Sequence, residues 1–597
     1  MSMNPTNIDS ESIKLKDNSK IAVIGAGPAG TFFSYFCLEL ARRDGLKIEL
    51  DIYESKDFSV CGPKGCNHCG GIVSESLVQI LSTEGINIPS KVIRRGINSY
   101  VMHMDVGSIK IETPLQEKRI AAMYRGAGPR GSQQVDWGSF DGFLQDLSIS
   151  KGANQINERV TEIDFGAELP VIKTRNGEAR QYDLVVGATG LQGKSINLYE
   201  QINFGFKAPE ATKTFICEFL LGKKKVEEYF GQSMHVFLLN LPRLQFGALI
   251  PKGEYVTLVL LGENIDNDLV KAFMNHQNVI ERFPEGWDLI KGYPCQCFPQ
   301  INIKGAVHPY ADRLVLVGDC AVSKLYKNGI GAAYMTGKAA AKTVVLHGIG
   351  QNDFEQYYYP TCKSLNLDNG IGKFIFGVTH FIQKRNFLKR GVLKMVEMEN
   401  TKSGNKRLMS TVLWDAFTGS APYREIFFRT LQPRFWGVFI WKILLSLIPF
   451  TKSKIGRDYL VSSDDLGQLY RDGEKIITQG EKGDSFYVIQ SGKVEVVQEK
   501  DGREIKVAEL GEQEFFGEMA IFEKDLRSST VRALGETRIL TVDYKTLLRT
   551  INSDPTLAFR LIQKMSARIR NMDNLVSRVM VNERRNWLDR PERNGGK

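Results

Sequence analysis

Short apolar runs recur before residue 350, each ending in small or acidic residues. They occupy 20–24, 48–53, 182–186 and 313–317. The first, third and fourth runs are mainly apolar, which is typical of strands buried on both faces of a parallel sheet, whereas the run at 48–53 alternates apolar residues with Glu49 and Asp51. Residues 31–42 follow the first run at helical spacing. The pattern therefore predicts an α/β fold.

The first run enters a G-x-G-x-x-G turn that opens the helix. Gly25 allows the tight turn, Gly27 lets the backbone approach a pyrophosphate, and Gly30 lets the helix pack close to the strand. Glu54 ends the second run, where a ribose 2′-OH needs an acceptor, and it argues against a 2′-phosphate. We expect a Rossmann-like dinucleotide site. Its turn residues are Gly25, Gly27, Pro28, Ala29 and Gly30.

A second glycine-led corner follows the last apolar run. Gly318 and Asp319 end that run, and after a loop a helix begins at Gly329 and Gly331. An acid in this place accepts from a polyol hydroxyl, and backbone N–H groups of the helix start bind a pyrophosphate or ring oxygen.

A further G-x-G-x-x-G, at Gly126, Gly128 and Gly131, is not followed by a helical pattern, so it does not predict a second nucleotide fold. We interpret it as a loop whose Arg125 and Arg130 face the anionic cofactor or substrate. A solvated loop is the alternative.

Three thiols and an imidazole lie within nine residues: Cys61, Cys66, His68 and Cys69. Three interpretations stay open. The group binds a metal, with Cys295 or Cys297 as a further ligand. Alternatively, Cys66 and Cys69 form a redox-active pair beside the cofactor. In the third interpretation the segment is a glycine-rich turn that lines the site.

The chain of 597 residues predicts two or three domains. Its nine cysteines are too scattered for a disulfide scaffold, and residues 1–19 are polar without a signal-peptide core. We expect a disordered segment at 1–19 and a cytoplasmic protein with reduced thiols.

Three strand ends in the stretch 20–347 are followed by glycine or other small residues. With these features the stretch resembles the para-hydroxybenzoate hydroxylase group of flavoproteins, most of all the geranylgeranyl reductases. The resemblance implies bound FAD. It places FAD-binding parts at 20–98, 121–201 and 301–350 of an oxidoreductase spanning 20–382. It also implies an antiparallel substrate sheet at 99–120 and 202–300.

The resemblance implies reduction of carbon-carbon double bonds in a prenyl or other long apolar, lipid-like substrate. It puts a cysteine near the flavin, and Cys66 and Cys69 are the candidate catalytic residues. The segment 246–252 keeps one ring, Phe246, of the reductases' aromatic signature. A flavin-dependent monooxygenase and a non-enzymatic, nucleotide-gated redox sensor are the alternatives, and the electron donor is open.

The segment 383–463 is predicted to be a basic amphipathic helical linker. Between 383 and 457 there are fifteen Lys or Arg and four Asp or Glu, which accounts for the net charge of +10 of the chain. The apolar stretch 435–450 is too short to cross a ~30 Å bilayer core. We expect it to lie on an anionic membrane surface, bound peripherally at the inner face of the membrane. The alternative is that it is buried against the flavin domain. The basic residues that flank it are Arg429, Arg434, Lys452 and Lys454.

From 464 the pattern changes to short strands with regular turns, which predicts an all-β jelly roll with terminal helices at 464–580. Residues 466–572 resemble a cyclic-nucleotide-binding domain. The resemblance implies that Glu518, after Gly517, accepts from the ribose 2′-OH and that Arg527, nine positions later, holds the phosphate. Ser528 serves cAMP or cGMP, and Leu526 stands where a proline is usual.

The fusion of the two domains in one chain motivates the hypothesis that cyclic nucleotide regulates the oxidoreductase. A degenerate domain used only for contacts is the alternative. The polar tail at 581–597 is too short for a helix-turn-helix, so we expect no nucleic-acid partner.

Overall fold

The computed structural model describes residues 13–67, 69–113, 117–132, 138–166, 168–191, 193–290, 295–401, 407–445, 464–500, 502–519 and 526–588. The chain forms two compact units. The first holds residues 1–78 and 88–466, and the second holds 79–87 and 467–597. Most of the predicted disordered segment, 1–12, lies outside the described residues.

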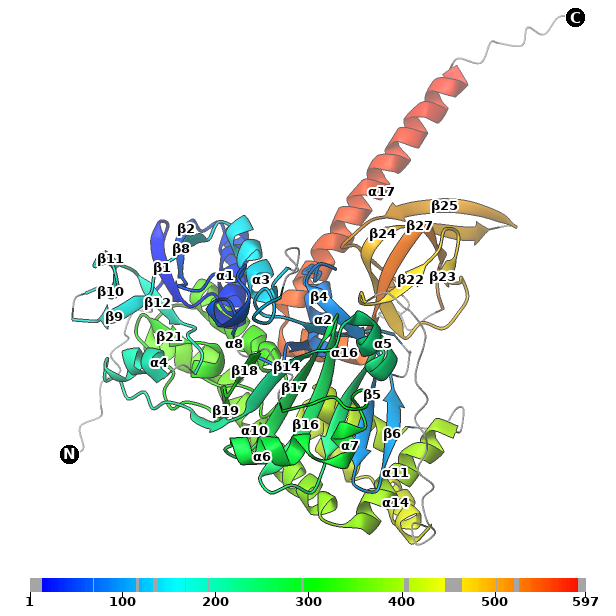
Figure 1. Ribbon diagram of the computed structural model, residues 1–597. Helices are drawn as coiled ribbons and strands as arrows, with labels where there is room; N and C mark the ends of the chain where they lie inside the picture. The colour runs from blue at the N-terminus through cyan, green and yellow to red at the C-terminus, as the bar shows by residue number, and fades with distance from the viewer. Residues whose placement is uncertain are drawn as a thin grey trace, which may run out of the picture. The chain divides into compact units, whose positions relative to one another are not determined.

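A mainly parallel sheet forms the N-terminal part of the first unit (Figure 1). The described strands lie in the order β20-β21-β12-β1-β2-β8, and only β20 is antiparallel to its neighbour. All four apolar runs become strands of this sheet. The bounds are β1 Ser19–Ile24, β2 Ile48–Tyr53, β8 Asn154–Ile156, β12 Leu184–Gly187, β20 Tyr310–Ala311 and β21 Leu314–Leu316.

Helices α1 (Pro28–Asp44) and α8 (Gly329–Leu346) pack against each other beside this sheet. Their close approach depends on Gly337, where an added Cβ would lie 2.8 Å from the Ala29 carbonyl oxygen of α1. Because β1, β2, β12 and β21 are parallel, their carboxyl ends meet at one edge, which is where ligands bind in such sheets.

A second, seven-stranded sheet has the order β18-β14-β17-β16-β15-β5-β6. Its described strands are antiparallel except for β15 and β5, which pair in parallel. The predicted antiparallel sheet is therefore mixed at this one pairing. The bounds are β5 Ser99–Met104, β6 Gly107–Glu112, β14 Phe215–Leu220, β15 Ser233–Leu238, β16 Leu244–Lys252, β17 Tyr255–Gly262 and β18 Cys295–Cys297.

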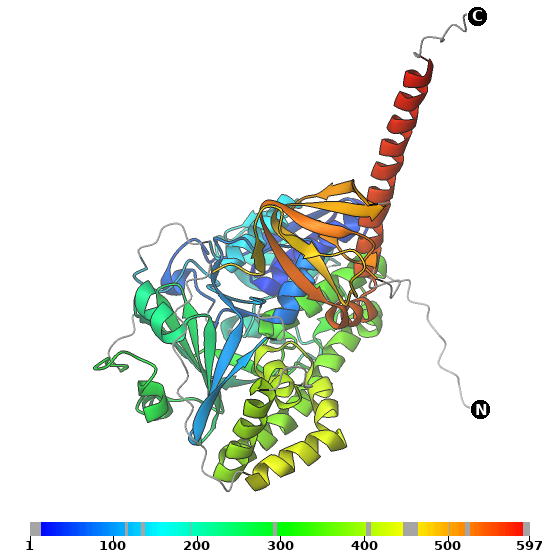
Figure 2. The ribbon, with the colours of Figure 1, turned by 90° about the vertical axis from the view of Figure 1, so that its right-hand side faces the viewer.

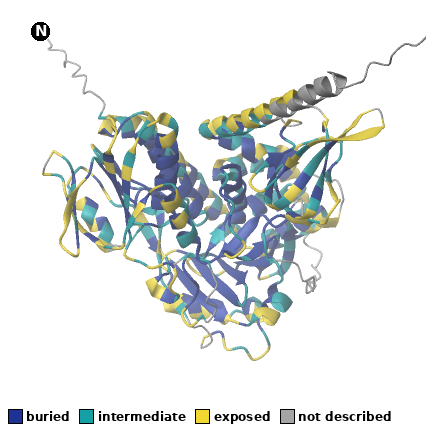
Figure 3. Cartoon of the chain, turned by 90° about the horizontal axis from the view of Figure 1, so that it is seen from above, coloured by how far each residue is buried: buried dark blue, intermediate teal, exposed yellow. Residues whose placement is uncertain are grey.

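Both faces of the seven-stranded sheet are covered, and its inner strands β5, β14, β15, β16 and β17 are almost entirely buried (Figure 3). One face packs on α5 (Lys223–Phe230), α6 (Asn267–Met274) and α7 (Gln277–Ile280). The opposite face packs on the helices from α10 onward. Alternating side chains of strands such as β16 therefore enter two separate cores.

Smaller elements complete the first unit. They are β3 Ile72–Val73, β4 Ile93–Ile97, β7 Ile120–Met123, β9 Val160–Asp164, β10 Val171–Thr174, β11 Ala179–Gln181, β13 Glu210–Lys213, β19 Gln300–Lys304, α3 Phe140–Ser150, α4 Gly193–Glu200, η2 Gly318–Cys320, α9 Gln351–Asp353 and the π-helical η3 Phe354–Tyr358.

The segment predicted to be a linker is part of the first unit's core. Figure 2 shows its helices, green to yellow, as one cluster. Trp414, Phe417, Phe435 and Phe439 are buried there with residues of the seven-stranded sheet. The bounds are α10 Tyr359–Gln383, α11 Asn386–Thr401, α12 Met409–Thr418, α13 Tyr423–Thr430 and α14 Pro433–Leu445. Residues 446–463, with Lys452 and Lys454, lie outside the described residues.

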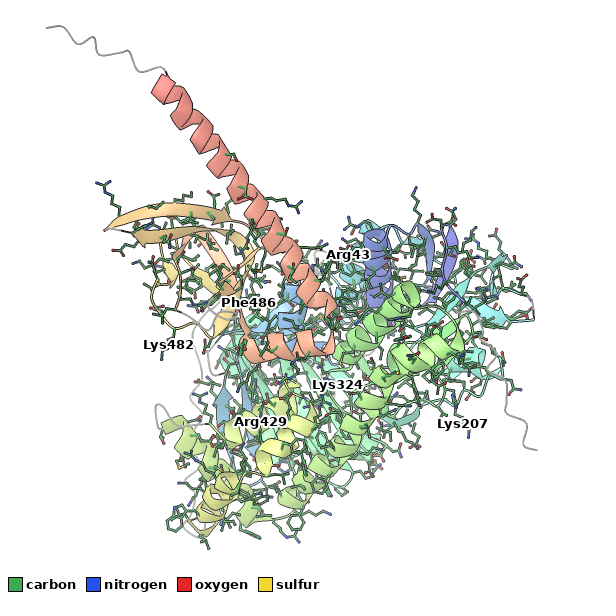
Figure 4. All side chains as sticks on the ribbon, turned by 180° about the vertical axis from the view of Figure 1, so that it is seen from behind. Arg43, Lys207, Lys324, Arg429, Lys482 and Phe486 are labelled. Atoms are coloured by element: carbon green, nitrogen blue, oxygen red, sulfur yellow. The ribbon has the colours of Figure 1, made fainter. Side chains whose placement is uncertain are left out.

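The second unit is a β-sandwich of the predicted kind followed by helices. Phe486, labelled in Figure 4, is buried at the start of its long strand β24. The bounds are β22 Gln468–Tyr470, β23 Lys475–Ile477, β24 Ser485–Lys500, β25 Arg503–Leu510, β26 Phe515–Phe516, β27 Thr530–Asp543, α16 Tyr544–Ser553 and α17 Thr556–Leu588. Helix α17 continues past 580, where the sequence places the start of a polar tail, and residues 589–597 lie outside the described part.

A short stretch from the N-terminal half of the sequence belongs to the second unit. The chain passes from the first unit to the second within α2 (Glu75–Thr83), so residues 79–87 lie in the second unit. The Asp543 backbone N–H donates to Gln79 Oε1 at 2.9 Å, and Arg560 forms an ion pair with Glu84 at 3.3 Å. The sequence analysis does not anticipate this placement.

Candidate functional site

In the glycine-rich turn of the first unit, two of the three motif glycines have no room for a side chain. Gly25 has a φ of 109°, and a Cβ there would lie 2.6 Å from the Ala188 carbonyl oxygen. A Cβ on Gly30 would lie 2.0 Å from the carbonyl oxygen of Gly25. By contrast, a Cβ on Gly27 would meet only side-chain ends, the nearest being Arg125 Nη2 at 3.2 Å. Gly25 and Gly30 are thus required by the fold itself, whereas Gly27 leaves the turn open beside a guanidinium.

Glu54 lies against this turn. One carboxylate oxygen accepts from the Ala26 backbone N–H at 3.0 Å, and the other accepts from the Lys56 N–H at 2.9 Å. The acid at the end of β2 therefore reaches the loop after β1, as the motif predicts.

Arg125 is fixed toward the turn by a buried acid. Its Nε and Nη2 donate to Asp141 of α3 at 2.9 and 2.7 Å, and Asn67 also donates to Asp141. Burial lowers the pKa of Arg125, but the Asp141 carboxylate outweighs it and raises that pKa above its ordinary value. Arg125 is a permanently charged group. The sequence analysis does not assign Asp141 and Asn67, which hold it.

The second glycine-led corner meets the first. Gly318 has a φ of 72°, and a Cβ there would lie 2.5 Å from Cβ of Ala29 in α1. Burial raises the pKa of Asp319. The hydrogen bond with Ser323 and the positive charge of Arg125 act in the opposite direction and lower this pKa. A Cβ on Gly329 would lie 3.4 Å from Ser323 Oγ and 4.0 Å from Asp319 Oδ1. The fold therefore brings Asp319 and the start of α8 to the same sheet edge as the N-terminal turn.

The start of α8 is capped from within the chain. Asn328, with a φ of 54°, accepts from the Gly331 N–H through Oδ1 at 3.1 Å. A Cβ on Gly331 would lie 2.4 Å from that oxygen, so glycine is required here by the cap itself.

The cysteine-rich loop lies between the cofactor turn and the seven-stranded sheet. Cys61 Sγ donates to the Ala127 carbonyl oxygen at 3.1 Å, which joins the loop to the second glycine motif. A Cβ on Gly70 would lie 3.0 Å from Val259 Cγ2, and one on Gly71 would lie 2.8 Å from Lys252 Nζ. Cys69 therefore precedes two glycines that lie directly on the sheet.

A buried lysine and a buried acid face this loop. Burial lowers the pKa of Lys252, an effect opposed by Glu218, Cys69 and Cys66. Glu218 accepts from Thr257 Oγ1 at 2.7 Å, and burial raises its pKa. Lys252 Nζ has no hydrogen-bond partner among the described residues, and it lies 4.7 Å from the centre of the Tyr124 ring. Lys252 is not among the predicted site residues. In the sequence it is marked only as a lysine that directly follows Pro251 in an apolar strand.

Cys295 and Cys297, which are distant in sequence, also lie near the cysteine-rich loop. Burial raises the pKa of Cys297 to about 12, and Cys66, Cys295, Glu218 and Cys69 add to that effect. Cys295 and Cys297 stand on β18, beside β14. Among the described residues, no group of three or more His, Cys, Asp or Glu is arranged to hold a metal ion, and His68 lies outside them.

In the second unit, Arg527 is enclosed by backbone. It donates to the Gly517 and Ser485 carbonyl oxygens at 2.7 and 2.8 Å. A Cβ on Gly517, whose φ is 82°, would lie 2.7 Å from Arg527 Nη1, and one on Gly483 would lie 2.5 Å from Arg527 Cζ. Ser528, next in sequence, is exposed. The two glycines thus make room for a buried guanidinium.

Glu518 is paired with the last helix of the chain. Arg568 of α17 donates to Glu518 Oε1 at 3.1 Å, and it also contacts the Phe515 carbonyl oxygen. Its guanidinium lies 4.8 Å from the centre of the Phe515 ring. The sequence analysis does not predict Arg568, because the helical pattern of α17 carries several arginines on its exposed side.

Residues 468–554 match the family model described as the cyclic nucleotide-binding domain. A CRP-like cAMP-activated global transcriptional regulator of Mycobacterium tuberculosis is 32% identical over 103 residues, 17% of this chain and 46% of the regulator. A cAMP-dependent protein kinase regulatory subunit of Mucor circinelloides is 32% identical over 111 residues, 18% of this chain and 26% of the subunit. This chain therefore spans less than half the length of these relatives.

Solved structures resemble the larger part of the chain. A geranylgeranyl bacteriochlorophyll reductase-like protein from Thermoplasma acidophilum is 15% identical, covers 70% of this chain and 99% of its own, and gives a TM-score of 0.48. A halogenase in complex with FAD is 12% identical, covers 72% and 91%, and gives 0.47. The chain thus combines a mixed α/β unit with a C-terminal unit in which residues 468–554 match the cyclic nucleotide-binding domain model.

Proposed function

We propose that the first unit is an FAD-dependent oxidoreductase that reduces carbon-carbon double bonds of a prenyl or other long apolar substrate, and that cyclic nucleotide bound to the second unit regulates it. One observation carries the cofactor assignment. Gly25, Gly27, Glu54, Asp319 and Gly329 meet at the carboxyl edge of one parallel sheet.

The residues present fit FAD. The open face at Gly27 and the start of α1 suit a pyrophosphate, and the Arg125 guanidinium beside it supplies a fixed positive charge. Glu54 is placed to accept from the adenosine ribose, and Asp319 is placed to accept from a ribityl hydroxyl. A bound FAD, once reduced, supplies a hydride for an alkene carbon.

The chain's own contribution is an apolar surface with a proton source. Ile250 and Val259 of the seven-stranded sheet lie beside Gly70, so a long apolar substrate is shielded from water there. In the proposed step the second hydrogen is a thiol proton from Cys69 or Cys66, since Cys69 directly precedes Gly70 at this surface. Transfer of that proton to the second alkene carbon completes the reduction, and a proton from solvent restores the thiol.

The contacts of α17 support the proposed regulation by nucleotide. Glu518 is the predicted ribose acceptor, and in this structure it is paired with Arg568. Arg560 lies two turns earlier on α17 and is paired with Glu84, which follows α2 in the chain. A nucleotide that binds Glu518 displaces Arg568 from this carboxylate. The resulting shift of α17 reaches α2 through the ion pair between Arg560 and Glu84.

The N-terminal end of α2 is held within the first unit. Glu75 forms an ion pair with Arg119 at 2.6 Å and accepts from Trp414 Nε1 at 2.6 Å and Ser420 Oγ at 2.8 Å. A displacement of α2 therefore acts on the helices that cover the seven-stranded sheet.

The test uses purified full-length protein, reduced with dithionite without oxygen and mixed with geranylgeranyl diphosphate. We expect a yellow protein that is reoxidised by the prenyl probe, with two hydrogen atoms gained per double bond. Product formation only with oxygen supports a monooxygenase instead. Reducible flavin without turnover of any alkene supports a redox sensor, and colourless protein that does not retain FAD contradicts the cofactor assignment.

A further inference from the structure

Three helices of the first unit expose large apolar side chains. On α10, Leu367, Phe374, Val378 and Phe381 are exposed, with Leu367 at 73% and Phe374 at 59%. Their spacing of seven, four and three positions places them along one stripe of the helix. Lys363 stands one turn before the stripe, and Lys384 and Arg385 follow it.

Helix α13 repeats this arrangement. Phe428 and Leu431 are exposed at 65% and 53%, and Arg424, one turn before Phe428, is exposed on the same side. The Phe374 ring contacts the Phe427 ring at 5.8 Å, and Phe427 contacts Phe428 at 5.9 Å. The stripes of α10 and α13 therefore lie next to each other.

Helix α14 is apolar on two sides. Phe435 and Phe439 are buried in the core, whereas Trp436, Ile440, Trp441 and Leu444 are exposed, Trp441 at 60%. A helix of a globular protein normally turns charged residues to solvent. Arg434, two turns before Trp441, is the exposed charge on this side. We name the exposed apolar residues of α10, α13 and α14 the aromatic surface.

The exposed charges of these helices are mostly positive. In 359–401 and 407–445, the exposed basic residues are Lys363, Lys373, Lys384, Arg385, Arg424 and Arg434, and Glu397 is the exposed acid. The other acids there are engaged. Asp368 accepts from the backbone N–H groups of Tyr423 and Arg424, and Glu399 accepts from those at the start of α12. Arg429, labelled in Figure 4, is itself paired with Asp415 and Glu425, so it does not add to this exposed positive charge.

We propose that the aromatic surface docks the protein on an anionic phospholipid bilayer, with α10, α13 and α14 lying on the interface. Trp and Phe side chains partition into the boundary between headgroups and acyl chains, and lysine and arginine bind anionic headgroups. A second protein copy would leave the basic residues facing one another, which disfavours self-association. No helix of the described residues is long and apolar enough to cross a bilayer. The docking does not depend on the chemistry of the first unit.

The test is flotation of full-length protein with vesicles of phosphatidylcholine alone or with about one third phosphatidylglycerol. We expect binding to the anionic vesicles that weakens as salt rises. Trp436→Gln with Trp441→Gln should lower binding about tenfold or more, and Lys384→Gln with Arg434→Gln should lower it only on anionic vesicles.

Matched controls lie on the opposite side of the seven-stranded sheet. Ile280→Gln on α7 removes an exposed apolar side chain, and Lys224→Gln with Lys271→Gln removes two exposed charges from α5 and α6. These variants should bind like the parent, and circular dichroism verifies that all variants fold. Absence of vesicle binding by the parent overturns the proposal. So does equal loss in the controls, or a Trp436/Trp441 variant that binds vesicles normally but changes from oligomer to monomer.

Discussion

Arg568 of α17 forms an ion pair with Glu518, and both groups are mostly buried. If the ribose of a bound nucleotide contacts Glu518, as proposed, it competes with this guanidinium for one carboxylate. We expect Arg568→Gln to bind cAMP about three to ten times more tightly than the parent, because the competing ion pair is removed. Anisotropy of a fluorescent cAMP analogue measures this. Arg570→Gln, on the exposed side of the same helix, should leave the affinity unchanged, and weaker binding by Arg568→Gln would contradict the competition.

Arg527→Lys tests the phosphate contact. The lysine keeps a positive charge but loses the planar pair of donors that reaches Gly517 and Ser485. We expect at least about 100-fold weaker nucleotide binding, with the flavin absorbance unchanged. Unchanged affinity would contradict the phosphate contact of Arg527, and absence of binding by the parent would favour a degenerate domain that serves only for contacts.

The link from α17 to α2 is tested at Arg560. Arg560→Gln removes the ion pair with Glu84 but leaves Glu518 and Arg527 intact. We expect normal cAMP affinity together with loss of any effect of cAMP on the rate of flavin reoxidation. If cAMP alters that rate equally in the variant and the parent, the signal does not pass through Glu84.

Gly27→Val tests the cofactor turn without damaging the fold. The added side chain meets only the ends of Arg125 and Asn67, so the unit should remain folded while the pyrophosphate site is filled. We expect colourless protein with a thermal midpoint within a few degrees of the FAD-free parent. Gly370→Val, where a side chain has open space, is the control and should retain FAD.

Lys327 predicts a pH dependence of stability. Burial lowers the pKa of Lys327 from 10.5 to about 7, and neighbouring Lys324 adds to this effect. The unfolded chain therefore binds more protons than the folded chain between pH 7 and 10.5, so the free energy of unfolding should rise with pH there, by up to about 1.4 kcal/mol per pH unit. Lys327→Met should flatten this slope in urea unfolding. Lys363→Met, at an exposed site, should retain it.

The cofactor corner was predictable because its requirements are local. Gly25 and Gly30 must be glycine because the backbone of the turn leaves no room for a side chain, and the sequence motif reflects this requirement. The apolar runs form parallel strands, so the carboxyl ends of these strands meet at one edge of the sheet. The positions of Cys297 and Lys252 were not predictable, since they reach the cysteine loop only through strand pairing across the seven-stranded sheet. The burial of Phe435 and Phe439 could not be decided from the sequence, because a helix with aromatic residues on one side and charges on the other fits both a membrane surface and a protein core.

Residues 79–87 have a consequence for dissecting the protein. A fragment that stops before 467 keeps this stretch but lacks the partners of Gln79 and Glu84, and one that begins at 467 lacks the stretch itself. Cutting the gene between residues 466 and 467 therefore yields two incomplete products. Only co-expressed fragments, or a nicked chain whose halves stay associated, should reproduce the behaviour of the intact polypeptide.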